Sequence, residues 1–226
     1  MKYPYLLLDA DNTLFDFDAG NRHAFHEVCA RYDIPDTEES FQCYERCNNA
    51  MWAAFDRGEC TKEFLVVQRF RNFLSAMGLD RDAEGCNALH LHTLSQCAFM
   101  LPYAEEVCHT LARSHKLYLV TNAVASVQRG RLAKSPIVPD ITAAFISEEA
   151  GAAKPSAAYF DYVFARIDGI TRENCLVIGD SISSDIRGAN NYGLPCCWYN
   201  PRHTPRPDGL RIDYEIDDLR ALCDIV

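Results

Sequence analysis

The sequence predicts an α/β fold whose core is a doubly wound parallel sheet with helices on both faces. The prediction rests on short apolar runs, each followed by polar or small residues and then by a helical pattern. Five such runs occur: "YLLLD" at 5–9, "KLYLVT" at 116–121, "AAFIS" at 143–147, "CLVIGD" at 175–180 and "PCCWYN" at 195–200. Continuous apolar runs of this length are typical of parallel strands that are buried on both faces.

Helical patterns lie between the later runs and complete a Rossmann-like alternation of strands and helices. We expect helices at 102–114, 124–133, 155–167 and 183–192. Pro102 and Pro155 are expected in the first turns of two of these helices, where proline is tolerated because the first backbone N–H groups need no intrahelical partner.

The region between the first and second runs breaks the alternation and predicts an inserted helical cap. Its helical segments are expected near 20–33, 37–57, 61–77 and 82–98, with Thr61 as a cap. We therefore predict a catalytic core of residues 1–16 and 100–226 and a helical cap of residues 17–99. Both hinges of the cap would fall near the carboxyl ends of core strands, where ligands bind in open α/β sheets.

Composition excludes several classes of protein. The chain has 226 residues, of which 48% are apolar, and no apolar stretch approaches the length of a membrane helix. A formal net charge of −10 argues against a nucleic-acid or anionic-membrane partner, because both would be repelled. The start of the chain lacks a secretory signal pattern, since Asp9 and Asp11 interrupt its apolar run. We expect a monomer or homodimer.

Cysteine usage indicates a reducing compartment. Eleven cysteines, an odd number, are scattered without metal-type spacing, which favours reduced thiols in a cytoplasmic protein. Cys43 and Cys47, one helical turn apart, and the adjacent Cys196 and Cys197 could instead bind a metal or be redox-active, although simple packing is the favoured interpretation.

The residues that close the runs predict a site at one edge of the sheet. In a parallel sheet the carboxyl ends of the strands meet, so this edge would gather Asp9, Asp11, Thr13, Thr121, Asn122, Lys154 and Asp180. Several converging carboxylates indicate a hard divalent cation, and Mg²⁺ also binds substrate phosphate. Asp9 and Asp180 are the expected ligands, and Asp185 is expected to orient metal-bound water without touching the metal.

A carboxylate at such a site can act as a nucleophile in phosphoryl transfer, and Asp9 is the candidate. Lys154, the Thr121 hydroxyl and backbone amides would neutralise the phosphate, and Asp11 would protonate the leaving oxygen and later activate water. Each group alone has a plainer interpretation as a turn, a helix cap or a solvated lysine. Four strand ends with complementary chemistry favour the site.

These motifs resemble those of the haloacid dehalogenase (HAD) superfamily of phosphohydrolases. The similar segments are "DADNT" at 9–13, "LVTN" at 119–122, "GAAKP" at 151–155 and "GDSISSD" at 179–185. The resemblance implies that Asp9 is the nucleophile and that Asp11 is the general acid/base and a metal ligand through its backbone carbonyl. It also implies that Thr121, Asn122 and Lys154 bind phosphate and that Asp180 binds magnesium.

Longer segments resemble the bacterial pyrimidine 5′-nucleotidases that remove noncanonical nucleotides. These segments are "DADNTLFDFD" at 9–18, "ISEEAGAAKP" at 146–155 and "IGDSISSDIRGANNYGLPCCWYN" at 178–200. Ala123 and Ser181 replace the glycine and threonine usual in that subfamily. The expected activity is a magnesium-dependent phosphomonoesterase of nucleotides. A phosphatase of phosphoglycolate or a sugar phosphate, a phosphomutase, a haloacid dehalogenase and a non-catalytic binding protein stay open as alternatives.

Aromatic residues are the candidates for substrate specificity. Phe15 and Phe17 lie near the predicted hinge, and Trp52 and Phe55 lie in the predicted cap. An aromatic ring at these positions could stack on a nucleobase, or it could fill the core of the cap. Arg69 could meet the polar edge of a base, but a solvated helix position is the favoured interpretation.

Overall fold

The computed structural model describes residues 2–226 and divides into two compact units. The core unit comprises Met1–Phe17 and Ala98–Val226, and the helical unit comprises Asp18–Cys97. Each unit has its own apolar interior.

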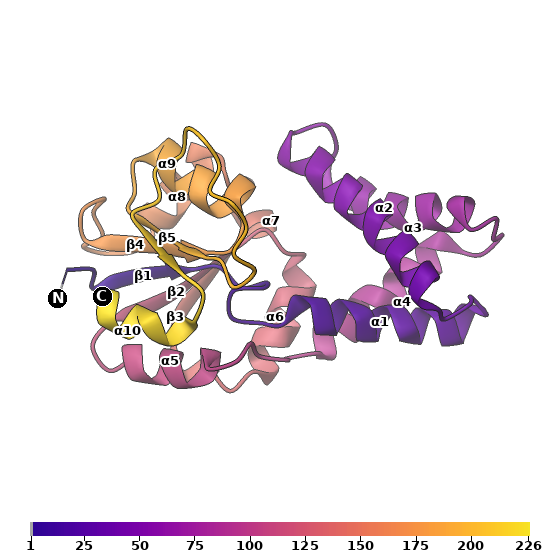
Figure 1. Cartoon of the computed structure of the whole chain (residues 1–226), viewed down its shortest axis with the longest axis horizontal. Helices are drawn as coiled ribbons and strands as arrows, with labels where there is room; N and C mark the ends of the chain where they lie inside the picture. The colour runs from indigo at the N-terminus through magenta and orange to yellow at the C-terminus, as the bar shows by residue number, and fades with distance from the viewer. Residues whose placement is uncertain (1) are drawn as a thin grey trace. The chain divides into compact units, whose positions relative to one another are not determined.

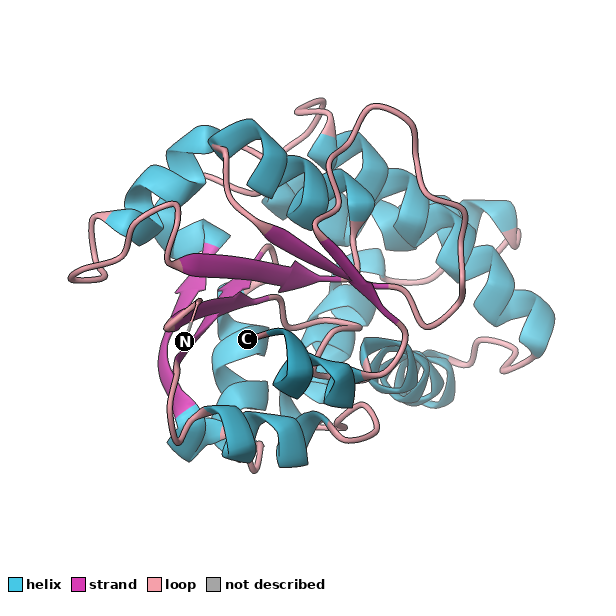
Figure 2. Ribbon diagram, turned by 60° about the vertical axis from the view of Figure 1, so that its left-hand side comes forward, coloured by secondary structure: helices cyan, strands magenta, loops and turns pink. Residues whose placement is uncertain are grey.

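The core unit is built on one six-stranded sheet, whose strands are magenta in Figure 2. Its strands are β1 (Tyr5–Leu8), β2 (Lys116–Thr121), β3 (Ile141–Ile146), β4 (Cys175–Gly179), β5 (Cys196–Tyr199) and β6 (Tyr214–Ile216). All neighbouring strands pair in parallel, in the order β3-β2-β1-β4-β5-β6. The predicted doubly wound parallel fold is confirmed. The sequence prediction missed β6, whose three residues are too few for a recognisable apolar run.

Alternate residues of the strands face two separate apolar clusters. Leu8 lies level with Leu119 of β2 and Ile178 of β4, and all three belong to one cluster, whereas Leu7 belongs to the other. The first cluster takes residues from α5 (Ala104–Leu111), α6 (Ala125–Lys134) and α10 (Leu222–Ile225). The second takes residues from α8 (Ala157–Phe164) and α9 (Arg187–Tyr192). Helices therefore cover both faces, as Figure 1 shows.

Two details of the predicted core helices are wrong. Pro102 and Pro155 precede their helices, because Tyr103 is the N-cap of α5 and the Ser156 side chain caps α8. The segment predicted as one helix at 183–192 begins with a π-helical turn, Ile182–Ile186, before α9. A π-turn in place of an α-turn often marks a functional site.

The remaining short elements of the core unit lie in its connections. They are η1 (Val138–Asp140) before β3, α7 (Ser147–Ala150) after β3, and η3 (Leu219–Ala221) before α10. The helix α7 directly follows β3 and ends at Gly151, three residues before Lys154. It thus belongs to the segment that carries the predicted lysine to the sheet edge.

Four helices form the helical unit: α1 (Phe17–Tyr32), α2 (Glu38–Asp56), α3 (Lys62–Ala76) and α4 (Ala83–Gln96). Their interior is an aromatic cluster centred on Phe25, Tyr44, Phe70 and Phe73. Thr61 caps α3 as predicted, since its side chain accepts a hydrogen bond from the Phe64 backbone N–H.

Arg69 in α3 is buried, so the prediction of a solvated position is wrong. Its guanidinium donates to the Val66 carbonyl (3.1 Å), Asn48 Oδ1 (2.9 Å) and Asn87 Oδ1 (3.3 Å), and its side chain is close to the Tyr44 and Phe70 rings. Burial lowers the pKa of Arg69. The sequence could not show this arrangement because the side-chain acceptors are neutral amides on two other helices, α2 and α4.

The cysteine thiols of the chain are all free, and most are buried. Cys43, Cys196 and Cys197 lie in apolar clusters, in agreement with the favoured packing interpretation. Within residues 2–226, none of the helices combines the length and apolar character needed to cross a membrane.

Candidate active site

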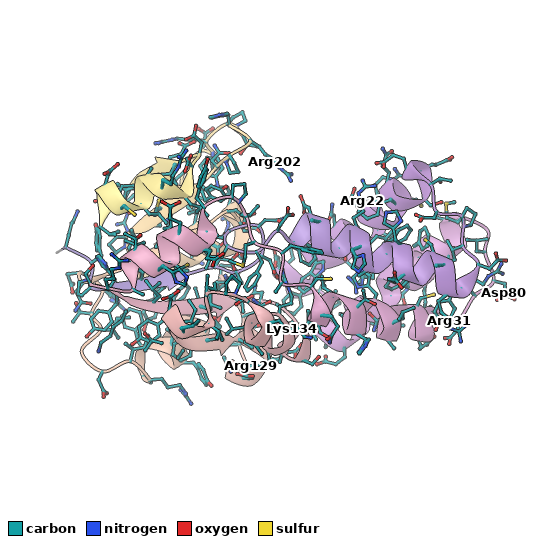
Figure 3. The ribbon with its side chains drawn as sticks, turned by 90° about the horizontal axis from the view of Figure 1, so that it is seen from below. Arg22, Arg31, Asp80, Arg129, Lys134 and Arg202 are labelled. Atoms are coloured by element: carbon teal, nitrogen blue, oxygen red, sulfur yellow. The ribbon has the colours of Figure 1, made fainter. Side chains whose placement is uncertain are left out.

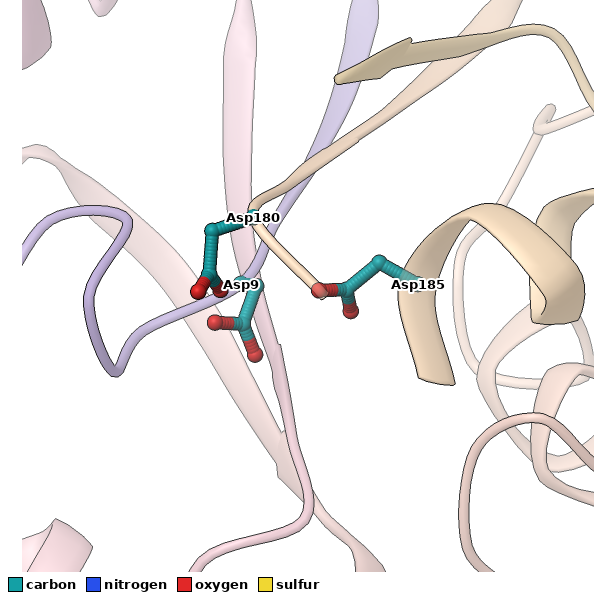
Figure 4. A group of neighbouring side chains, drawn as sticks. All are labelled: Asp9, Asp180 and Asp185. Atoms are coloured by element: carbon teal, nitrogen blue, oxygen red, sulfur yellow. The ribbon is translucent and has the colours of Figure 1, made fainter. Parts of the chain in front are cut away.

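Three carboxylates converge at the carboxyl edge of the sheet, beyond neighbouring strands β1 and β4. Asp9 directly follows β1, Asp180 directly follows β4, and the Asp9 backbone N–H donates to the Ile178 carbonyl (2.8 Å). Asp185 reaches the same place from the π-helical turn. Oxygen atoms of the three side chains lie within 4.8 Å of one another, and Figure 4 shows the carboxylates grouped together.

Lys154 supplies the positive charge at this cluster. Its ammonium donates to Asp9 Oδ1, Asp185 Oδ1 and the Val120 carbonyl, each at 2.6 Å, which uses all three of its N–H bonds. Only 2% of the residue is exposed. Burial alone would lower the pKa of Lys154, but the charges of Asp185 and Asp9 raise it, so the ammonium stays protonated.

The carboxylates of Asp9 and Asp180 are destabilised as anions despite this lysine. Burial first, and then the charge of Asp185, raises the pKa of Asp9 well above its ordinary range, while Lys154 acts in the opposite direction. The same two causes raise the pKa of Asp180 to about 7. Three acidic groups share one cation here. An additional positive charge bound at the cluster would therefore stabilise the ionised carboxylates.

An oxygen-only donor set of this kind suits a hard divalent cation. The residues that could hold the metal are Asp9 and Asp180. Asp185 has both oxygens in use, since Oδ1 accepts from Lys154 and Oδ2 accepts from the Ser181 backbone N–H at 3.1 Å. Its geometry therefore fits the predicted orienting role.

Hydroxyl and indole groups hold the two strand-end aspartates in place. Thr13 Oγ1 lies 3.3 Å from Asp9 Oδ2 and accepts a hydrogen bond from the Asp180 backbone N–H at 3.1 Å. The Trp198 indole donates to the Asp180 carbonyl at 2.9 Å. The sequence prediction placed Thr13 at this edge but missed Trp198, because a tryptophan inside a strand predicts only core packing.

The two residues at the end of β2 have different contacts. Thr121 is buried, and its oxygen accepts a hydrogen bond from the Ala123 N–H (3.2 Å), which leaves its own O–H free to donate to a phosphate. The Asn122 amide donates to the Lys154 carbonyl (2.8 Å) and accepts from the Lys154 N–H (2.9 Å). The Asn122 side chain thus holds the Lys154 backbone, and the role of Asn122 in phosphate binding stays a prediction.

Asp11 lies apart from the three-carboxylate cluster and pairs with an arginine that the sequence prediction missed. The Arg131 guanidinium of α6 donates to Asp11 Oδ1, and the Arg131 side chain is 1% exposed against 26% for that of Asp11. Arg131 resembles a solvated helix residue in sequence. Arg131 lies four residues after the apolar Val127, and residues four apart share one face of a helix. This spacing could have indicated that Arg131 faces inward.

The aromatic candidates have different environments. Phe15 is fully buried in the core cluster with Arg131 over its ring, so the structure argues against the predicted contact of Phe15 with substrate. Phe17 is partly exposed. Trp52 and Phe55 are also partly exposed and meet edge to face, with ring centroids 5.7 Å apart. These two rings are outside the buried cluster of the helical unit.

The raised pKa of Asp180 predicts a pH-dependent stability when no divalent metal is bound. The folded protein holds the Asp180 proton up to about pH 7, whereas the unfolded chain releases it near the ordinary value of 3.8. The contribution of Asp180 to the free energy of unfolding is therefore fully present below the ordinary value of 3.8, and it is lost as the pH rises through about 7. We expect Asp180→Asn protein to match the unmodified protein near pH 4 and to be more stable above pH 7.

Urea unfolding in EDTA, repeated across this pH range, measures the difference between the two proteins. Asp208→Asn, which changes an exposed aspartate of the same unit, is the matched control and should show no such trend. A difference between Asp180→Asn and the unmodified protein that stays constant with pH would contradict the prediction.

Known hydrolases resemble this chain in sequence and in fold. The model of the HAD-hydrolase-like family matches residues 151–222. The chain is 33% identical to pyrimidine 5′-nucleotidase PynA of Streptococcus pneumoniae, over 99% of this chain and 95% of PynA. It is 29% identical to pyrimidine 5′-nucleotidase YjjG of Escherichia coli, over 98% and 97% of the two chains. The crystal structure of HAD-hydrolase YfnB from Bacillus subtilis bound to magnesium has a TM-score of 0.95 and 33% identity, covering 100% of this chain and 99% of YfnB.

Proposed function

The chain belongs to the haloacid dehalogenase superfamily of hydrolases and is a phosphatase of that family, and we propose that it hydrolyses pyrimidine nucleoside 5′-monophosphates. The observation that carries the proposal is the cluster of Asp9, Asp180 and Asp185 at the sheet edge, in which the Lys154 ammonium pairs with Asp9 and Asp185. Relatives named pyrimidine 5′-nucleotidase match nearly the whole length of the chain, which supports the nucleotide as substrate.

The proposed reaction has two steps. An Asp9 oxygen attacks phosphorus, a new O–P bond forms, and the bond to the ester oxygen breaks as Asp11 gives that oxygen a proton. In the second step Asp11 takes a proton from water, the water oxygen attacks phosphorus, and the bond to Asp9 breaks to release phosphate. Lys154 and the Thr121 hydroxyl would stabilise the charge of the phosphoryl oxygens.

Magnesium is the proposed cofactor. When bound by Asp9, Asp180 and the Asp11 backbone carbonyl, it would neutralise charge on the phosphoryl group. The raised pKa values of Asp9 and Asp180 support the assignment, because a cation at this place would relieve the repulsion between their carboxylates. YfnB, the magnesium-bound relative, has the same fold with a TM-score of 0.95.

The helical unit is the proposed source of base recognition. Trp52 and Phe55 present partly exposed rings, and such rings can stack on a pyrimidine. Phe17 at the start of α1 is a third candidate. We further place the enzyme in the cytoplasm, because its free cysteines suit a reducing compartment.

A substrate panel tests the proposal. Phosphate release is measured from UMP, dUMP, dTMP, CMP, AMP, phosphoglycolate and sugar phosphates, with magnesium and with EDTA. We expect release from pyrimidine nucleotides that EDTA abolishes and magnesium restores. Preferred release from phosphoglycolate or a sugar phosphate would contradict the nucleotide assignment.

The same assay separates the other reaction types. Isomerised sugar phosphate with little free phosphate would identify a mutase, and halide release from a haloacid without metal would identify a dehalogenase. Binding of magnesium and nucleotide without turnover would identify a binding protein. Each of these results would overturn the proposed function.

A further inference from the structure

We propose that Arg131 is a positioning residue that fixes the direction of the Asp11 carboxylate for proton transfer to the leaving oxygen and from water. The inference rests on the proposed function, because that function assigns proton transfer to Asp11. None of the four sequence motifs includes Arg131, which lies ten residues beyond Thr121 in α6.

The contact joins a buried group to a partly exposed one. The Arg131 side chain is 1% exposed, and its Nη1 makes an ion pair with Asp11 Oδ1. The Asp11 side chain is 26% exposed, so one part of the carboxylate is fixed by protein and the rest stays open to solvent or substrate. A proton donor needs this combination of fixed direction and access.

The guanidinium is itself held on several sides. It lies 4.6 Å from the centroid of the Phe15 ring and 5.9 Å from that of Phe17. Gln128, one turn earlier in α6 and fully buried, accepts a hydrogen bond from the same Nη1 at 3.4 Å. Because neighbours restrict the arginine, its contact restricts the rotamer of Asp11 in turn.

The Asp11 backbone is fixed independently of this ion pair. Leu14 and Phe15 both donate their backbone N–H groups to the Ala10 carbonyl (2.9 and 2.8 Å), and Asn12 donates to the Phe15 carbonyl (2.8 Å). The turn therefore holds the Asp11 Cα without help from Arg131. What the arginine adds is the direction of the side chain, so its loss should change proton transfer rather than the fold.

The choice of leaving group provides a selective readout. A nucleoside leaves as a poor alkoxide and needs a proton from Asp11, whereas p-nitrophenolate leaves from p-nitrophenyl phosphate without one. A misdirected Asp11 should therefore slow formation of the phosphorylated enzyme from UMP much more than from p-nitrophenyl phosphate.

The experiment compares Arg131→Met with Arg129→Met in single-turnover assays. Arg129 lies on the same helix, is half exposed, and pairs with Glu149 at the surface; Figure 3 labels it. We expect Arg131→Met to slow the UMP reaction by about 10- to 100-fold. This loss is smaller than the rate enhancement of about 10²- to 10⁴-fold that a general acid usually provides, because Asp11 itself is still present. The burst of p-nitrophenolate should change by less than about threefold, and Arg129→Met should resemble the unmodified enzyme.

Two further variants separate positioning from folding. Arg131→Lys keeps a cation and should recover part of the UMP rate. In Asp11→Asn protein, Arg131→Met should have no further effect, because the group that it positions is gone. Urea unfolding of every variant reports stability separately from rate.

The outcomes are distinct. Equal loss on both substrates, an Arg131→Met effect that persists in Asp11→Asn protein, or an Arg131→Met rate equal to that of Arg129→Met would overturn the inference while leaving the proposed function standing. Absence of phosphate release in the unmodified enzyme would instead overturn the proposed function.

Discussion

Replacing Asp9 by asparagine is expected to lower the rate of phosphate release from the preferred nucleotide by about 10⁴-fold or more. An amide oxygen cannot take the place of the carboxylate as nucleophile. Asparagine nevertheless keeps an Oδ1 that can accept the Lys154 hydrogen bond now made at 2.6 Å. The substitution thus removes the reacting charge with little change in shape, so the loss should appear in kcat while the protein stays folded.

Acid-quenched reactions analysed by mass spectrometry test the covalent step directly. The unmodified enzyme mixed with substrate should carry one phosphoryl group on the peptide that contains Asp9, and the Asp9→Asn protein should carry none. Asp168→Asn, a change at an exposed aspartate of the core unit, is the control and should keep full activity. Phosphate release that persists in Asp9→Asn protein would show that the nucleophile is another group.

Replacing Lys154 by methionine is expected to have the second large effect, on stability as well as activity. The ammonium is buried and bonds to both Asp9 and Asp185, so its removal leaves two buried carboxylates without their counter-charge. Breaking a buried pair in this way usually costs about 3–5 kcal/mol of folding free energy. Phosphate release should also fall by about 10²- to 10³-fold, as for the loss of one group that stabilises the transition state.

Urea unfolding at neutral and acidic pH checks the stability effect. The destabilisation should shrink at acidic pH, because the pKa of Asp9 is raised and its protonated carboxyl no longer needs a cation. Lys134→Met is the matched control, since Lys134 is an exposed lysine of α6, labelled in Figure 3. If Lys154→Met unfolds at the same urea concentration as Lys134→Met, the three bonds at 2.6 Å contribute nothing to stability.

The sequence predicts the central strands of the core unit well, because each of these buried strands is a continuous apolar run in the sequence. "KLYLVT" is β2 residue for residue, and the runs around Asp9 and Asp180 end within one residue of β1 and β4. The convergence of Asp9, Lys154 and Asp180 follows from the parallel direction of the strands. Parallel topology thus made part of the site predictable from strand ends alone.

What the sequence did not show depends on contacts between distant segments. Arg131 is buried because the Phe15 and Phe17 rings lie beside its guanidinium and Asp11 pairs with it, and these partners are more than a hundred residues away in sequence. Arg69 is buried through amide acceptors on other helices. The composition of a helix does not show which of its charged residues find such partners.

The position of β1 in the sheet also determines when a working enzyme can exist during synthesis. β1 is made first, yet its two neighbours are β2 at 116–121 and β4 at 175–179, so it stays unpaired until distant segments have been made. The helical unit, whose contacts are local, can form much earlier, because short loops close faster than long ones. A nascent chain that ends before β4 has an open strand edge and neither Asp180 nor Asp185. Catalysis therefore cannot begin before Asp185, in the last third of the chain, has been made.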